Sequence, residues 1–137
     1  MKKAKVLIVS SVYNESIVKN LIHTALKQLN TQPWIQKSLI KVPGAFEIPV
    51  TIEKYIKKFD GAVALGCIIK GETNNFDLIS KSITDSLLQL SLKHKKPIGN
   101  GIITCFNKKQ ANSRKDKGRE AAIAVQVVLS SFPKKVS

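Results

Sequence analysis

The sequence predicts an α/β protein, a three-layer sandwich in which helices flank a four-stranded parallel sheet. Two features predict this class. Short apolar runs rich in β-branched residues alternate with longer stretches in which apolar residues recur every three or four positions, the pattern of β-α-β units. The strand runs are also apolar at successive positions, as in parallel strands that helices cover on both faces.

The N-terminal half supplies two strands and two helices. Residues 6–10 form an unbroken apolar run typical of a central strand, and residues 15–29 carry apolar side chains at helical spacing. Residues 38–42 predict a second strand, which the turn-forming pair Pro43 and Gly44 ends. The helix that follows has an apolar stripe at four positions: Phe46, Val50, Ile52 and Ile56.

The C-terminal half repeats this alternation. Residues 62–69 predict the most buried strand, residues 76–94 a long helix, and residues 98–105 a fourth strand that two glycines break. Residues 108–118 are basic and are expected to form a loop. A last helix follows with an apolar stripe at four positions: Ala121, Ala124, Val125 and Val128. We expect one domain, residues 1–137, without repeats or linkers.

The charge balance is unusual, with 23 Lys and Arg against 9 Asp and Glu and a formal net charge of +14. Such a surplus attracts polyanions. The lysines are scattered rather than clustered, and an aromatic content of 6% is low for a base-stacking surface. Compositional drift is therefore the favoured explanation, ahead of a phosphate-bearing small substrate, and nucleic-acid binding is the least supported.

The two cysteines, Cys67 and Cys105, stand far apart within apolar runs and predict neither a disulfide framework nor a zinc site. Their pattern indicates a reducing, cytoplasmic location. The first apolar run follows Lys2 and Lys3 but is only as long as a strand and lacks the cleavage pattern of a signal peptide. No segment has the length needed to span a bilayer.

Ligands of open parallel sheets bind beyond the carboxyl ends of the strands, here residues 11–14, 42–47, 67–75 and 104–108. In the third segment, the turn from Gly71 to Asn75 opens a helix, whose exposed N–H groups and dipole suit an anion. The turn is equally compatible with an ordinary helix start capped by Thr73 or Asn75.

Three other residue types are candidates at or near these ends. Tyr13 follows the first strand and could either stack on a flat heterocycle or cover the core. Glu47 lies in the first turn of a helix, where the dipole stabilises a carboxylate, so a structural role is its default interpretation. The two histidines, His23 and His94, lie within helices and are expected to be structural or solvated.

Several stretches together are similar to lumazine synthase over nearly the whole chain. The most specific are the block from Val42 to Pro49 and the Gly-Glu-Thr turn. The matching stretches are Val12-Tyr13-Asn14, Val42-Pro43-Gly44-Ala45-Phe46-Glu47-Ile48-Pro49, Ala64-Leu65-Gly66-Cys67-Ile68-Ile69-Lys70-Gly71-Glu72-Thr73, Phe76-Asp77, Pro97-Ile98-Gly99-Asn100-Gly101-Ile102-Ile103-Thr104, Asp116-Lys117-Gly118 and Glu120-Ala121-Ala122.

This resemblance implies a flavodoxin-like fold and an enzyme of riboflavin biosynthesis, a transferase without a cofactor or metal. The family condenses 5-amino-6-(ribitylamino)uracil with 3,4-dihydroxy-2-butanone 4-phosphate and releases phosphate and water. The substrate-binding residues that the resemblance implies are Tyr13 and Asn14 at the pyrimidine, Ala45, Phe46 and Glu47 at the ribityl chain, Cys67, Ile68 and Ile69 at the edge of the heterocycle, and Asn100 from a neighbouring subunit.

The resemblance also implies a phosphate site and a catalytic pair. Gly71, Glu72 and Thr73 would present N–H groups to the phosphate, and Arg114 would be its counter-charge, with Lys115 as the rival. The catalytic residues implied are Lys117 and the residue at position 75.

Position 75 departs from the family, which usually has His there as a proton shuttle. Asn75 cannot act as an acid or base near neutral pH. The alternative to an active enzyme is therefore a catalytically impaired relative that binds pyrimidine or flavin-like ligands.

The family's sites lie between subunits, so a homo-oligomer is expected. The chain lacks the N-terminal strand and the insertion associated with 60-subunit shells, which favours a pentamer or a pair of pentamers. A riboflavin synthase is a candidate partner, and no membrane partner is expected.

Overall fold

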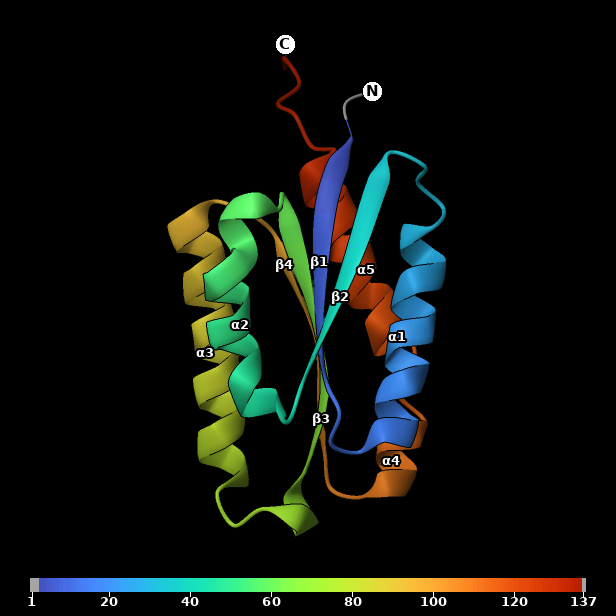
Figure 1. Ribbon diagram of the computed structural model, residues 1–137, viewed down its shortest axis with the longest axis vertical. Coiled ribbons are helices and arrows are strands. Elements are labelled where there is room, and N and C mark those ends of the chain that lie inside the picture. The colour runs from blue at the N-terminus through green and yellow to red at the C-terminus, as the bar shows by residue number, and fades with distance from the viewer. Residues whose placement is uncertain (1–2, 137) are drawn as a thin grey trace.

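The structure, a computed structural model, describes residues 3–136. Four strands form one parallel sheet in the order β2-β1-β3-β4, and helices cover both of its faces (Figure 1). The strands are β1 (Ala4–Ser11), β2 (Ile35–Val42), β3 (Gly61–Ile69) and β4 (Ile98–Cys105). The α-helices are α1 (Glu15–Leu29), α2 (Ile48–Tyr55), α3 (Phe76–His94), α4 (Lys108–Asn112) and α5 (Lys117–Leu129). This strand order confirms the three-layer, flavodoxin-like prediction.

The apolar run of β1 reflects a strand whose two faces are both buried. Val6 and Ile8 pack in a cluster with α1 and α5, whereas Leu7 and Val9 pack in a second cluster with α2 and α3. All of these side chains are fully buried. The alternation of side chains along a strand therefore divides one apolar run between two cores.

The edge strands differ from the prediction for two physical reasons. Strand β2 starts at Ile35 rather than at residue 38. Because exposed side chains of an edge strand can be polar, no apolar run marks the first residues of this strand in the sequence. Strand β4 is continuous and is not broken by its glycines. A Cβ on Gly99 would lie 2.2 Å from the backbone oxygen of Ala121, so this glycine marks the close approach of α5.

The helices contain three further differences. The helix after Pro43 starts as a 3-10 turn at Ala45–Glu47 and becomes α2 at Ile48. Within the predicted basic loop, α4 forms a short helix. Four residues predicted to lie on apolar stripes are instead exposed: Phe46, Val50, Ala124 and Val128.

A polar cluster joins α2 to α3. The Glu53 carboxylate lies 3.0 Å from the Lys93 ammonium and 2.8 Å from His94 Nε2. Hydrogen bonds from His94 and then Lys93 hold the pKa of Glu53 below its ordinary value of 4.5. The side chain of His94 is only 10% exposed, so this histidine has the structural role expected of it.

The lowered pKa of Glu53 predicts a pH-dependent contribution to stability. A carboxyl whose folded-state pKa is depressed stabilises the fold above its unfolded pKa, and the contribution is lost as the pH falls through the folded value. Glu53→Gln should therefore lower the melting temperature at pH 7, with the difference from the native protein closing near pH 3. Thermal melts followed by circular dichroism at both pH values measure this.

The matched control is Asp85→Asn, which removes an exposed pair with Lys81 on α3. Exposed pairs contribute little, so this variant should melt close to the native protein at both pH values. A pH-independent loss in Glu53→Gln would show that packing, rather than charge, links the two helices.

Candidate active site at the carboxyl ends of the strands

A cavity of about 180 Å³ opens at the carboxyl ends of β1 and β3. In a sheet of this strand order, the connections from β1 and β3 leave to opposite sides, and ligands bind at this switch point. We call it the switch-point cavity. It is lined by Tyr13, Gly44, Ala45, Phe46, Cys67, Ile68, Ile69, Glu72, Thr73 and Ile79.

The first wall of this cavity follows β1. Tyr13 is 56% exposed and Phe46, across the opening, is 68% exposed. Next to Tyr13, Asn14 has a left-handed backbone with φ 59, which Asn tolerates better than most residues. The Nδ2 of Asn14 is buried without a partner among the described residues. Buried amide groups of this kind normally have a hydrogen-bond acceptor, but Asn14 itself does not line the cavity.

Glu47 lies beside the switch-point cavity without lining it. Its Oε1 accepts a hydrogen bond from the backbone N–H of Gly44 at 2.9 Å, which closes the turn before α2. The residue lines a neighbouring groove of about 390 Å³, and only Phe46 belongs to both hollows. One carboxylate oxygen of Glu47 is therefore structural, as its default interpretation held.

The floor of the switch-point cavity is the end of β3. Cys67, Ile68 and Ile69 are buried there and contribute to its lining. Burial first, and then the neighbouring Cys105, raise the pKa of the Cys67 thiol to about 12. The thiol is thus protonated at neutral pH, and Cys67 is a wall rather than a nucleophile.

The turn after β3 supplies the remaining wall. A 3-10 turn spans Lys70–Glu72, and Glu72 and Thr73 line the cavity, whereas Gly71 does not. Thr73 Oγ1 accepts a hydrogen bond from the backbone N–H of Asn75 at 3.3 Å. Asn75 is the N-cap of α3, but its side chain makes no capping hydrogen bond. It is exposed and is not part of the cavity lining.

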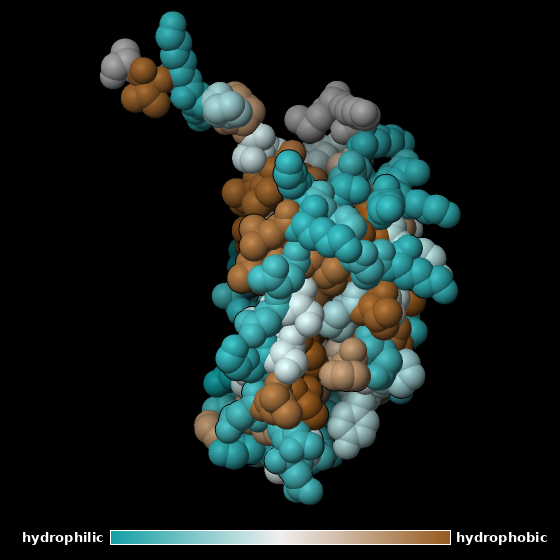
Figure 2. Space-filling model, turned by 90° about the vertical axis from the view of Figure 1, so that its left-hand side faces the viewer, coloured by the Kyte–Doolittle hydropathy of each residue, from teal (hydrophilic) through white to brown (hydrophobic). Residues whose placement is uncertain are grey.

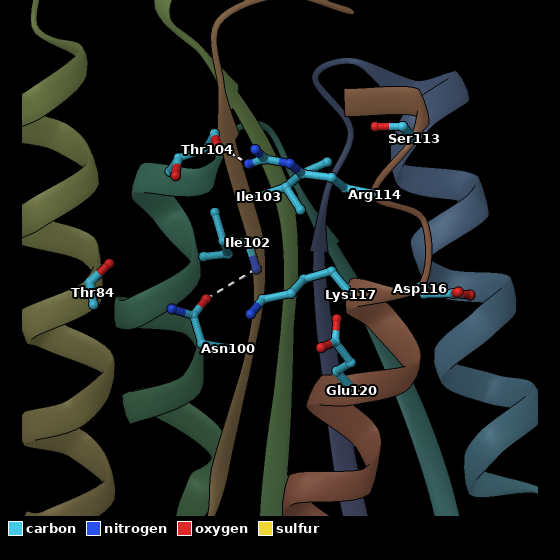
Figure 3. Close-up of a pocket in the computed structure, with 10 residues that line it drawn as sticks. All are labelled: Thr84, Asn100, Ile102, Ile103, Thr104, Ser113, Arg114, Asp116, Lys117 and Glu120. Atoms are coloured by element: carbon cyan, nitrogen blue, oxygen red, sulfur yellow. Dashed lines mark hydrogen bonds between the residues drawn. The ribbon is translucent and has the colours of Figure 1, made fainter. Parts of the chain in front are cut away.

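A second, larger cavity of about 540 Å³ lies along the edge strand β4. Figure 3 shows its side chains, which come from α3, β4, the segment after α4, and α5. We call it the edge cavity. It is lined by Thr84, Asn100, Ile102, Ile103, Thr104, Ser113, Arg114, Asp116, Lys117 and Glu120. None of these residues lines the switch-point cavity.

Three residues expected at the site belong to the edge cavity. Arg114 donates from Nη1 to the backbone oxygen of Thr104 at 2.8 Å, which fixes its guanidinium at the cavity. Asn100 accepts from the backbone N–H of Ile102 at 3.0 Å, and Lys117 extends towards it (Figure 3). Lys115 does not line this cavity; its backbone oxygen accepts from Thr24 on α1. Of these two rival residues, only Arg114 therefore lines the edge cavity.

Sequence reasoning missed several lining residues, and it located the histidines outside the site. Ile79 and Thr84 line the two cavities from α3, and nothing in their helical spacing marks them as functional. His23 is exposed on α1, and neither histidine lines either cavity.

Residues 3–136 contain no candidate for a metal site or a membrane span. No cluster of three or more potential metal-ligating side chains occurs there. No helix in that range combines the length and apolar character of a membrane span.

The fold and the site define an α/β protein with a cavity at its switch point, two exposed aromatic side chains that line this cavity, and cationic side chains along one sheet edge. Residues 3–131 match the sequence profile of the family described as 6,7-dimethyl-8-ribityllumazine synthase. The chain belongs to this family.

Individual relatives agree with this assignment, and each of the following is described as a 6,7-dimethyl-8-ribityllumazine synthase. The protein from Bdellovibrio bacteriovorus is 36% identical, with 94% of this chain and 74% of that one covered. The protein from Thermobifida fusca is 34% identical, with 85% and 73% covered. The protein from Limosilactobacillus reuteri is 36% identical, with 94% and 88% covered.

One solved structure, a flavone reductase, has a TM-score of 0.47 and 14% identity, with 95% of this chain and 66% of that chain covered. This likeness is too low to support a functional comparison.

Proposed function

We propose that this protein is a lumazine synthase, condensing 5-amino-6-(ribitylamino)uracil with 3,4-dihydroxy-2-butanone 4-phosphate in riboflavin biosynthesis. Membership of the family over residues 3–131 supports this activity. The observation that carries it is geometric: Tyr13, Ala45 and Thr73, from three separate segments, line one cavity at the switch point. A cavity formed from these segments is where the fold binds ligands.

The pyrimidine substrate fits the aromatic side of the switch-point cavity. Tyr13 stacks on the ring, and the unpartnered Nδ2 of Asn14 donates to it or to the ribityl chain. Ala45 and Phe46 border the chain, and the carboxylate of Glu47 accepts from its hydroxyls with the oxygen that Gly44 does not occupy. The end of β3, Cys67 to Ile69, fits the edge of the heterocycle.

The phosphoester fits the opposite side, where the turn after β3 meets the start of α3. The phosphate lies against the turn from Gly71 to Thr73, with the backbone N–H groups of Gly71 and Glu72 as its donors, because the N–H of Thr73 already donates to the backbone oxygen of Lys70. Arg114 supplies a guanidinium that pairs with phosphate in a bidentate manner. Charge binding of this kind makes phosphate a better leaving group.

The complete site requires a second copy of the chain. At about 180 Å³, the switch-point cavity is smaller than the roughly 300–1,000 Å³ of typical ligand pockets. Arg114, Asn100 and Lys117 lie in the separate edge cavity. We infer that the edge cavity of one subunit faces the switch-point cavity of the next. Repeating such a head-to-tail contact closes a ring, and we propose a pentamer, alone or paired.

The surface of α2 and α3 supports assembly. Figure 2 shows apolar residues among hydrophilic ones on this face. Val50 on α2 and Leu88 and Leu92 on α3 are 66%, 56% and 62% exposed. Apolar side chains gathered on one face are typical of an interaction surface. Contact between subunits would bury them.

The chemistry consists mainly of positioning. The amine of the pyrimidine attacks the ketone, and an imine forms with loss of water. Phosphate is then eliminated, and ring closure by the ribitylamino nitrogen, with loss of a second water, completes the product. Holding two substrates in register removes much of the entropic barrier to the first step. Lys117, next to Asn100 in the edge cavity, contributes a positive charge to this arrangement. No cofactor is needed for these steps.

The location and partners are part of the same proposal. Both cysteines are free and buried, which fits a reducing compartment, and we infer the cytoplasm. A riboflavin synthase that consumes the product is the proposed partner. The formal charge of +14 favours encounter with a phosphate-bearing substrate.

The experiment that tests the activity mixes the purified protein with both substrates and follows lumazine fluorescence and phosphate release. Turnover above the uncatalysed rate, with one phosphate per lumazine, is the expected result. Absence of turnover, together with pyrimidine binding by calorimetry, would instead identify the catalytically impaired relative that Asn75 suggests.

A further inference from the structure

The switch-point cavity contains one carboxylate, Glu72, to which the proposed mechanism has assigned only a backbone role. Three ionisable side chains line this cavity: Tyr13, Cys67 and Glu72. The proposed reaction needs a group that moves protons beside the phosphate. We therefore compared these three side chains, together with the neighbouring Asn75, as candidates for that group.

Only Glu72 among them fits. The Cys67 thiol is held protonated, since burial raises its pKa to about 12. Tyr13 lies across the cavity, where its ring is the stacking surface. Asn75 carries an amide, which does not exchange a proton usefully at neutral pH, and it does not line the cavity. Glu72 is exposed at the turn before α3 and reaches the cavity beside Thr73.

We propose that the Glu72 carboxylate is the general base of phosphate elimination. This inference rests on the proposed function. In the imine, the carbon between the imine carbon and the phosphate-bearing carbon loses a proton to the carboxylate. The electron pair of that C–H bond forms a C=C bond, and the C–O bond to phosphate breaks, with phosphate taking its electron pair. The protonated carboxyl then returns the proton to the terminal carbon of the enol, which becomes a methyl group, while the enol hydroxyl loses its own proton to the released phosphate and becomes the ketone oxygen.

The position of Glu72 suits this step because its own N–H is proposed to bind the phosphate, and its side chain lines the same cavity. The carbon that loses the proton is one bond away from the phosphate-bearing carbon. A carboxylate that projects from a phosphate-binding turn is thus close to the acidic C–H. General bases act within hydrogen-bond reach of the proton they remove.

Among the described residues, Glu72 takes part in no ion pair, so its carboxylate has no fixed cationic partner. The cation on the same turn, Lys70, lies 5.3 Å from the centre of the Phe106 ring, so its charge is directed to the ring. The other ionisable residues that line the cavity are Cys67, from β3, and Tyr13, from the segment after β1.

The test compares Glu72→Gln and Glu72→Asp with the native enzyme in steady-state assays across pH. Glu72→Gln should lower kcat by about 10²–10⁴-fold, with the KM for the pyrimidine changed little. In the native enzyme, kcat should rise with pH as a carboxyl loses its proton. This rising limb of the pH profile should be missing in Glu72→Gln. Glu72→Asp should keep the rising limb but have a lower kcat. In a third variant, Glu72→Ala, added formate should restore part of the rate.

The control is Glu15→Gln, which removes an exposed carboxylate on α1 and should leave kcat and the pH profile unchanged. Native-like kcat in Glu72→Gln, or an acidic limb that persists in it, would overturn the role of Glu72 while leaving the proposed function intact. Failure of the native protein to form any lumazine would overturn the proposed function itself.

Discussion

Replacing Gly118 with alanine should lower the free energy of unfolding by about 3 kcal/mol, at the upper end of the usual cost of overpacking. A Cβ at this position would lie 2.2 Å from the backbone oxygen of Leu21 and 2.6 Å from Thr24 Oγ1. The first of these atoms belongs to the backbone of α1, so relief requires α1 and α5 to move apart. Urea unfolding followed by circular dichroism measures the change.

Helix α5 makes this substitution costly because it holds two parts of the protein together. Its Ala121 and Val125 pack in the core with Leu21, and Asn100 and Arg114 line the edge cavity with the first turns of α5. A shift of α5 would therefore disturb both the core and the proposed half-site.

The matched control is Gly71→Ala, because the nearest atom to a Cβ at that position is the Phe106 backbone oxygen at 4.0 Å. Its unfolding free energy should stay within about 0.5 kcal/mol of the native value, as for most surface changes. Equal stability of Gly118→Ala and the native protein would mean that the two helices have room to separate.

Sequence periodicity predicts elements well where packing produces it. The bounds of α1, α3 and β4 match the predicted ranges, because buried helix faces and strands require regular apolar spacing. Helix α4 could not be predicted in this way. The Asn107 side chain accepts from the N–H of Gln110 at 2.8 Å, and the Gln110 side chain accepts from that of Phe106 at 2.7 Å. Side-chain caps, rather than an apolar stripe, hold this short helix.

The sequence predicted residues of the candidate site, but it did not predict that they are divided between two cavities. The carboxyl ends of parallel strands meet at one edge of the sheet. This rule predicted that Tyr13, Ala45 and Thr73 lie together, and the three residues line one cavity. Arg114 and Lys117 follow the carboxyl end of β4, yet they line the separate edge cavity instead of the switch-point cavity. The order of residues does not reveal which side of a sheet edge a loop covers, so the two half-sites emerge only from the three-dimensional arrangement.

Replacing Arg114 with alanine should lower kcat/KM for the phosphorylated substrate by about 10²–10³-fold, the usual cost of removing one group that stabilises developing charge. Arg114 lines the edge cavity and is fixed by its hydrogen bond to Thr104. Its loss removes the bidentate partner of the phosphate. Lys115→Ala is the matched control, since Lys115 carries the same charge one residue later outside the cavity, and it should retain nearly native activity.

A mixing experiment with Arg114→Ala tests whether two subunits form each site. Co-expression with a variant altered in the switch-point cavity, Tyr13→Ala, should give assemblies in which some sites combine the native Arg114 of one subunit with the native Tyr13 of the next. Turnover of the mixed assembly should then exceed that of either variant alone. If both residues served the same subunit's site, mixing would restore nothing, because every site would contain one defect. The activity of the mixture therefore reports directly on whether the edge cavity and the switch-point cavity of adjacent copies are two halves of one active site.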